Sequence, residues 1–143
     1  MKVWRISNYA DLKGEGGVRF GGRWHTKGKP VIYTAEHPAL AMLEILVNIP
    51  TGNLPGNYRL LEIAMPDGTA IDVAEPKAKW QDDLSITRRS GDSWLIERKS
   101  AVLKVPSALL PHTYNYLINP LHADARKFRV LSAQDYPFDR RLK

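Results

Sequence analysis

One carboxylate stands inside an almost uninterrupted apolar run, ALAMLEILV, at residues 39–47. On a helix, Leu40, Leu43 and Val47 share the face of Glu44, so we expect a core helix in which Glu44 is at least partly buried. An unpaired buried carboxylate costs more free energy than burial of a neighbouring leucine returns, so a partner is implied. Two interpretations stay open: a structural ion pair with a basic residue, or a carboxylate that faces a ligand.

A glycine-rich segment, residues 13–29, is the second candidate for chemistry. It holds six of the ten glycines and carries Arg19 and Arg23. Because glycine permits positive φ and close approach of the backbone, an irregular loop here could cradle a diphosphate. The standard motifs are not met: the G-x-G-x-x-G frame from Gly14 meets Arg19 at its last position, and no G-K-S/T triplet follows a strand. The alternative is a set of ordinary turns.

Two classes of chemistry are disfavoured by residue content. The chain has no cysteine, which excludes thiolate nucleophiles, disulfides and cysteine-ligated zinc. The histidines do not follow H-x-x-x-H spacing, so we expect no metal site. They are His25, His37, His112 and His122.

The elements that must position these residues mix helix and strand. Alternating or β-branched segments predict strands, and a proline followed by good helix formers predicts the helix that carries Glu44. A second helix is expected in residues 90–100, with Ser90 or Asp92 near its N-cap. The predicted strands lie in residues 2–7, 31–35, 58–66, 101–106 and 127–136, and the first helix in 38–48. This pattern predicts an α+β fold: one compact domain over residues 1–143, with a mixed sheet core and flanking helices.

Composition indicates a globular protein with anionic partners. Hydrophobic residues make up 43%, and no apolar run is long enough to span a bilayer, so no membrane partner is expected. The N-terminus lacks the pattern of a secretory signal, which favours a cytoplasmic location. The formal net charge of +6 favours nucleotides, nucleic acid or an acidic protein as partners. The tryptophans Trp4, Trp24, Trp80 and Trp94 are expected to anchor the core.

Six segments in order resemble the RES-domain family, the toxins of Xre-RES toxin–antitoxin modules. The resemblance covers almost the whole chain, and the joint occurrence of the six segments makes it specific. They are GGRW (21–24), IYTAEHPALAMLE (32–44), GDSWL (91–95), VPSALLP (105–111), NYLINPLH (115–122) and FDRRL (138–142).

The resemblance implies an ADP-ribosyltransferase-like fold and a toxin that cleaves the nicotinamide–ribose bond of NAD. NAD would be the substrate, and no further cofactor is expected. Water, inorganic phosphate or a protein side chain stay open as the acceptor of the ribosyl cation. The implied partner is a cognate Xre-type antitoxin, which covers the active site and binds DNA for the complex.

The resemblance also carries over site residues. Arg23, Tyr33, Glu44 and Ser107 match the catalytic positions, and Arg23 and Tyr33 are also expected to bind substrate. The other expected substrate-binding residues are Trp24, beside Arg23, and Asn119, within NYLINPLH. His25 departs from the family, which more often has asparagine after GGRW.

These residue types suit the reaction. Nicotinamide leaves as a neutral group, so positive charge builds on the ribose, and Glu44 would bind a ribose hydroxyl and stabilise that cation. Arg23 would grip phosphate, and Tyr33 would stack on the nicotinamide. Ser107 would orient Glu44 rather than act as a nucleophile, because no histidine stands in an evident relay with it. The ordinary alternatives are that Tyr33 is core, Ser107 closes a turn and Arg23 pairs with Glu44.

One alternative function comes from another class, an RNA-directed toxin or nucleic-acid-binding module. It is motivated by the charge of +6 and by Trp and Arg interleaved in the first 25 residues. Against it, the basic residues form no stripe and no RNA-binding fingerprint is present. We therefore expect no direct nucleic-acid partner.

Overall fold

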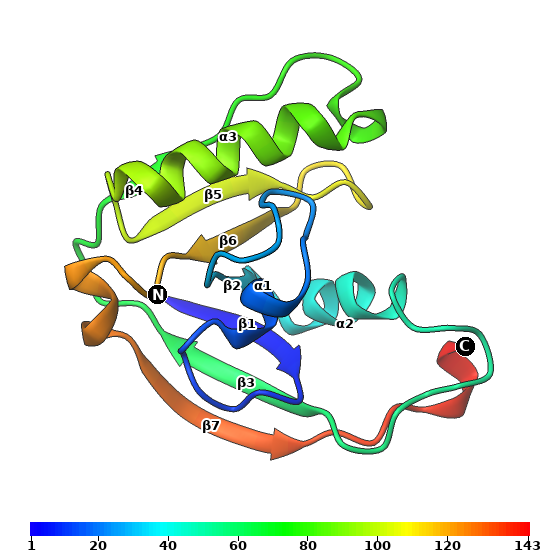
Figure 1. Ribbon diagram of the computed structural model, residues 1–143. Coiled ribbons are helices and arrows are strands. Elements are labelled where there is room, and N and C mark those ends of the chain that lie inside the picture. Colours follow the sequence, from blue (N-terminus) through cyan, green and yellow to red (C-terminus); the bar gives the residue numbers. More distant parts are fainter.

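Seven strands form one mixed sheet in the computed structural model, which describes residues 1–143 (Figure 1). Their order is β4-β5-β6-β2-β1-β3-β7, and only the β4–β5 pair is parallel. The strands are β1 (Lys2–Ser7), β2 (Ile32–Ala35), β3 (Arg59–Ala64), β4 (Ile71–Val73), β5 (Val102–Pro106), β6 (Tyr114–Ile118) and β7 (Arg129–Asp135). The helices are α1 (Glu15–Arg19), α2 (Pro38–Leu46) and α3 (Leu84–Glu97), with short 3-10 turns at Trp80–Asp82, Ala123–Lys127 and Arg140–Leu142. The predicted α+β class with a mixed sheet is confirmed.

The strands form where the sequence alternates or concentrates β-branched residues. All five predicted strands are present, and β5 ends at Pro106 as expected. Two strands were missed. β4 has only three residues, too few to show the two-residue period of a strand. β6 has the sequence YNYLI, in which apolar and polar residues do not alternate cleanly.

Helix α2 begins where the sequence predicts. The His37 imidazole accepts a hydrogen bond from Ala39 N at 3.1 Å, and Pro38 occupies the first turn, where its missing N–H costs nothing. The expectation of a helix apolar and buried all round is wrong in part. Leu40 is buried, but Leu43 and Val47 are exposed, because α2 packs against β1 and β2 with one side only.

Helix α3 begins earlier than predicted. Asp83, rather than Ser90 or Asp92, is its N-cap, and its carboxylate accepts a hydrogen bond from Ser85 N at 2.9 Å. Ser90 and Asp92 lie in the middle of the helix. Several residues in this region can cap a helix, so local chemistry alone did not select the start.

The glycine-rich segment is partly helical, which corrects the prediction of a fully irregular loop. Gly14 adopts a left-handed conformation (φ 77°) and leads into α1. A Cβ at Gly17 would lie 2.6 Å from the carbonyl oxygen of Lys29, so α1 can pack this closely only with glycine there. Gly91 of α3 has the same role against the carbonyl of Trp24. The glycine-rich segment is therefore packed closely between the sheet and α3.

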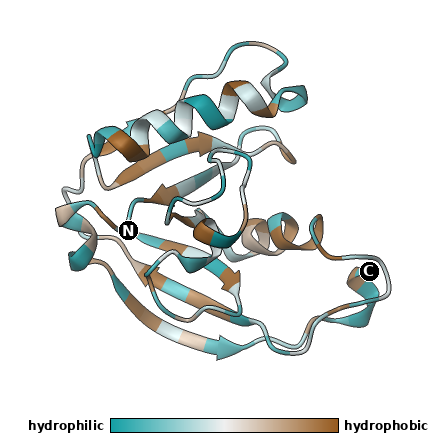
Figure 2. Cartoon of the chain, viewed as in Figure 1, coloured by the Kyte–Doolittle hydropathy of each residue, from teal (hydrophilic) through white to brown (hydrophobic).

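Three clusters of apolar side chains form the core, and Figure 2 shows hydrophobic residues recurring along the strands. Trp24, Trp80 and Trp94 are buried in the cluster between α3 and the strands β5 and β6, as expected of core anchors. Trp4 is only half-buried. No helix has the length and hydrophobicity needed to cross a membrane.

Candidate active site

A cavity of about 800 Å³ opens where α2, the glycine-rich segment and the start of α3 meet the sheet. Glu44 of α2, Tyr33 of β2 and Arg23 of the glycine-rich segment line it together. Three residues separated in sequence and predicted to act together therefore share one cavity. Glu44 is half-buried, and the prediction that it is at least partly buried is confirmed.

Two side chains hold the Glu44 carboxylate. Ser107 Oγ and Asn115 Nδ2 each donate a hydrogen bond to Glu44 Oε1, both at 2.7 Å. Glu44 forms no ion pair, so the interpretation of Glu44 as one half of a structural ion pair is wrong. Glu44 Oε2 receives no hydrogen bond from the protein. One oxygen is thus fixed by neutral donors, and the other is available to a ligand.

Ser107 is placed to orient Glu44. It follows the end of β5, is buried, and donates to the carboxylate while accepting a hydrogen bond from Leu109 N at 3.1 Å. Both bonds occupy its hydroxyl within the protein. The geometry fits a positioning residue, and no histidine is hydrogen-bonded to the Ser107 hydroxyl to form a nucleophilic relay.

Asn115, which sequence reasoning missed, is the second donor to Glu44. It belongs to β6, the strand that was not predicted, so its side chain had no expected position. Its Oδ1 is the one buried side-chain polar atom in the structure without a hydrogen-bond partner. Leaving such an atom unsatisfied costs about 1–3 kcal/mol. A polar side chain kept at that cost next to a carboxylate indicates a site rather than ordinary packing.

Three arginines converge on the cavity from three elements. Arg23 lies with its Cζ 5.9 Å from the Trp80 ring centroid and donates to Gln81 O at 3.1 Å. Arg88 of α3 donates from Nε to Gly22 O at 2.8 Å. Arg5 of β1 also lines the cavity, and burial lowers its pKa to about 10. The cavity therefore carries more positive than negative charge.

Arg5 and Arg88 were not singled out from the sequence. Arg5 sits in a strand between the buried residues Val3 and Ile6, where a charged side chain is unusual, and that signal could have found it. Arg88 lies one turn before Asp92 on α3, on the side that faces the glycine-rich segment. Arg88 lies outside the helix predicted for residues 90–100, so the sequence could not assign it to a helix face.

Two expected substrate-binding residues do not line the cavity. Trp24 is 2% exposed and packs on Trp80, with ring centroids 5.7 Å apart. Asn119 is 1% exposed and is bonded inside the core, donating to Leu95 O and accepting from Leu121 N, both at 3.1 Å. Any effect of these two residues on a ligand must pass through the packing around them.

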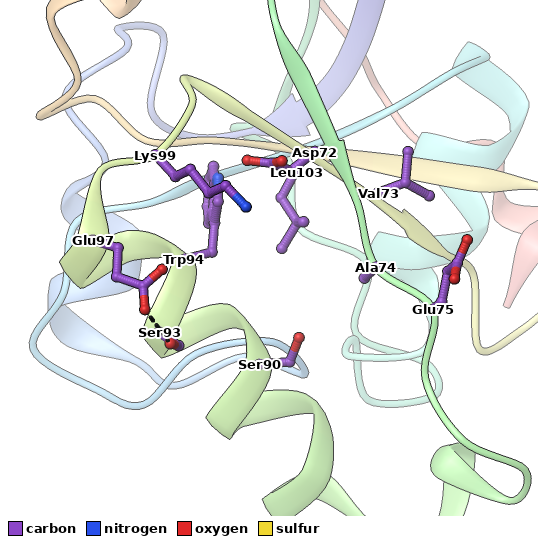
Figure 3. A pocket seen from close by; sticks show the side chains of 10 residues that line it. All are labelled: Asp72, Val73, Ala74, Glu75, Ser90, Ser93, Trp94, Glu97, Lys99 and Leu103. Carbon is purple, nitrogen blue, oxygen red and sulfur yellow. Dashed lines mark hydrogen bonds between the residues drawn. The ribbon is translucent and has the colours of Figure 1, made fainter.

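A second, smaller hollow of about 340 Å³ lies between β4 and α3 (Figure 3). Its charged lining residues are Asp72, Glu75, Glu97 and Lys99, and Glu97 accepts a hydrogen bond from Ser93. No group of three or more histidine, cysteine or acidic side chains in the structure is arranged to hold a metal ion. This hollow contains none of the predicted site residues.

Comparison with known proteins identifies the family of this chain. The RES domain family matches residues 2–140. The chain belongs to the RES-domain family. It is 42% identical over 146 residues to "Toxin Res" of Pseudomonas putida, covering 99% of both chains. It is 34% identical over 152 residues to the "Prs ADP-ribosylating toxin" of a Sphingobium species, covering 97% of this chain and 94% of the relative.

A further relative and a solved structure come from Mycobacterium tuberculosis. The chain is 32% identical over 90 residues to the "NAD(+) phosphorylase MbcT" of Mycobacterium tuberculosis, covering 58% of this chain and 48% of the relative. The structure resembles a chain of the crystal structure of the M. tuberculosis MbcT–MbcA toxin–antitoxin complex, with a TM-score of 0.71. That match has 19% identity and covers 94% of this chain and 83% of the other. This likeness shows a shared fold, and the predicted membership of the RES-domain family is confirmed by the family match.

Proposed function

We propose that this RES-domain protein is the toxin of a toxin–antitoxin module and cleaves the bond between nicotinamide and ribose in NAD. The observation that carries the proposal is the half-buried Glu44 carboxylate, held through Oε1 by two neutral donors and open at Oε2, in a cavity with three arginines. The names of its relatives, a toxin, an ADP-ribosylating toxin and an NAD(+) phosphorylase, support it.

Glu44 would act on the reacting sugar. Because nicotinamide departs neutral, positive charge develops on the ribose, and the group most useful there is a negative charge already in place. Ser107 and Asn115 hold Oε1, so Glu44 needs little reorganisation as the cation forms. Oε2 would accept a hydrogen bond from a ribose hydroxyl.

The arginines would bind the diphosphate. A guanidinium stays protonated and presents paired donors that match phosphate oxygens. Arg5, Arg23 and Arg88 lie on the sheet, the glycine-rich segment and α3 respectively, so they can contact one anion from several sides. Tyr33 would pack its ring on the nicotinamide, with its hydroxyl bonded away from the ligand. Trp24 would contribute through its packing on Trp80, over which Arg23 lies, and Asn119 by tying α3 to the end of β6.

We further propose that a cognate antitoxin of the Xre type restrains the enzyme in the cytoplasm by covering the cavity. Exposed apolar side chains stand at the cavity lining, with Phe20 71% and Val47 55% exposed. Such side chains favour burial against a protein partner. The acceptor of the ribosyl group would be water, inorganic phosphate or a protein side chain.

The test is an assay of the purified protein with NAD, with and without phosphate and with and without the cognate antitoxin. Nicotinamide release and the identity of the ribosyl product are followed by chromatography. We expect release from NAD, suppression by the antitoxin, and a product that identifies the acceptor. Intact NAD in all conditions would refute the proposal.

Glu44→Gln is the matched variant for this assay. It keeps the shape of the side chain and removes the charge, so we expect normal thermal unfolding and a loss of turnover of at least about 100-fold, in the range found for groups that stabilise transition-state charge. Glu36→Gln is the control. Glu36 is also acidic but lies near the start of α2, and this variant should turn over NAD normally. A Glu44→Gln enzyme as fast as the wild type would contradict the role given to this carboxylate.

A further inference from the structure

His25 is 1% exposed and connects α1 to two segments of the cavity wall. Its Nε2 lies 3.0 Å from the carbonyl oxygen of Gly17 in α1. Its Nδ1 lies 2.7 Å from the Tyr33 hydroxyl oxygen of β2 and 3.2 Å from the backbone nitrogen of Gly22. A single imidazole therefore connects a helix, a strand and the backbone next to Arg23.

The partners determine the tautomer. A carbonyl oxygen can only accept, so Nε2 carries the proton and donates to Gly17. Nδ1 is then an acceptor, to which the Tyr33 hydroxyl and the Gly22 N–H both donate, and the Gly22 N–H also donates to the His25 carbonyl oxygen at 3.1 Å. The Tyr33 oxygen in turn accepts a hydrogen bond from Trp24 N at 3.1 Å. The Tyr33 hydroxyl proton therefore has its acceptor only while His25 is neutral, because Nδ1 is the one acceptor bonded to that hydroxyl.

There is no spare room around this cluster. A Cβ on Gly22 would lie 2.5 Å from the Tyr33 hydroxyl and 3.1 Å from His25 Nδ1. Gly22 also presents its carbonyl to Arg88 Nε at 2.8 Å. A shift of the His25–Tyr33 pair would therefore displace the backbone that carries Arg23 and orients Arg88.

The charges near His25 come from α3. Burial, the largest influence, lowers the pKa of His25 below its ordinary value, and the charge of Arg88 adds to this lowering. The hydrogen bond to the Gly17 carbonyl and the charge of Asp92 oppose it. Asp92 is occupied by Thr26, whose N and Oγ1 donate to it at 2.9 and 2.8 Å, and by Lys29 at 3.7 Å. Burial also raises the pKa of Tyr33, so its hydroxyl stays protonated and able to donate.

We propose that His25 is a positioning residue for NAD cleavage: as the neutral Nε2–H tautomer it locks the Tyr33 ring and the Gly22–Arg23 backbone into the cavity wall. Protonation of Nδ1 places a third donor against Gly22 N–H and the Tyr33 hydroxyl, and the wall loosens. This inference rests on the proposed function for its activity readout, and its structural part is tested without substrate.

Two substitutions separate the two nitrogens. His25→Asn keeps an acceptor at the same bonded distance from Cβ as Nδ1 and loses the donor to Gly17. His25→Gln keeps a donor at the same bonded distance as Nε2 and loses the acceptor for Tyr33 and Gly22. If positioning acts through Nδ1, kcat/KM of His25→Asn stays within about threefold of wild type, while that of His25→Gln falls roughly tenfold or more.

The pH profile and a double substitution exclude a merely structural role. Wild-type kcat/KM should fall as the pH is lowered through the titration of His25, and His25→Asn should lack that step. In a Tyr33→Phe background, the further loss caused by His25→Gln should shrink to about twofold, because the bond to the hydroxyl is already gone. Ser100→Ala is the control: this buried hydroxyl bonds Trp94 and Asp72 away from the cavity, so its loss lowers stability without altering the pH profile.

Nuclear magnetic resonance tests the structural part on the protein alone. The imidazole nitrogen shifts should report the Nε2–H tautomer above the pKa of His25, and the Gly22 amide should lose hydrogen-exchange protection as His25 protonates. Equal losses in His25→Asn and His25→Gln with an unchanged pH profile, or an Nδ1–H tautomer, would overturn the proposal. A wild-type protein that leaves NAD intact but shows the tautomer and the loss of protection would refute the proposed function while supporting the role of His25 in the wall.

Discussion

Asn115→Ala should separate activity from stability at the Glu44 carboxylate. The substitution removes one of the two donors to Glu44 Oε1, a 2.7 Å bond, and leaves Ser107 as the only one. A hydrogen bond to a charged group contributes about 1.5–3 kcal/mol. If that bond is needed to hold Glu44 against the developing ribosyl cation, its loss lowers kcat/KM by roughly ten- to hundredfold, since about 1.4 kcal/mol corresponds to a factor of ten.

Stability should change far less. Asn115 Oδ1 is buried without a partner, and its removal relieves about 1–3 kcal/mol, similar to the free energy of the lost bond. The two contributions oppose one another, so we expect the free energy of unfolding to change by less than about 1 kcal/mol. Urea denaturation measures this change, and steady-state nicotinamide release measures kcat and KM.

The Ser107→Ala variant and the double variant complete the experiment. Both donors bind one oxygen, so their effects on kcat should be non-additive. Asn53→Ala, in an exposed loop, is the control and should match the wild type. The reasoning is refuted if Asn115→Ala keeps wild-type kcat/KM, or if its activity falls only in proportion to a large loss of stability.

Two further predictions concern Arg88 and pH. Arg88→Gln removes a guanidinium from the cavity and its bond to Gly22 O, so the KM for NAD should rise roughly tenfold with a smaller change in kcat. The control, Arg89→Gln on the exposed side of α3, should leave both KM and kcat unchanged. Equal kinetics for the two variants would contradict phosphate binding by Arg88. Because burial lowers the pKa of His25 in the folded protein, the unfolded chain binds more protons once the pH falls below the ordinary value of 6.5. The wild type should therefore lose stability relative to His25→Asn as the pH falls from 6.5 towards the folded-state pKa, and urea denaturation curves that stay parallel across that range would exclude this linkage.

Local sequence patterns were sufficient where an element carries its own signals. The helix of Glu44 has Pro38 at its start and a continuous run of helix formers, and its apolar composition implied that the carboxylate needed a partner. The same reasoning failed at α3, because Asp83, Ser90 and Asp92 are all able to cap a helix. The choice among them depended on burying Thr87 and Gly91 against the glycine-rich segment, which is a tertiary contact.

The amino-acid sequence by itself determined the α+β class, most of the strands, and the need for a buried carboxylate with a partner. It did not determine which partner, because hydrogen bonds between residues 63 and 71 positions apart leave no periodic trace. Only the tertiary structure placed Ser107 and Asn115 on one oxygen of Glu44 and brought Arg5 and Arg88 to the same cavity. The physical reason is that secondary structure follows from neighbours along the chain, whereas a site made from three strands, two helices and the glycine-rich segment exists only once the sheet has aligned them.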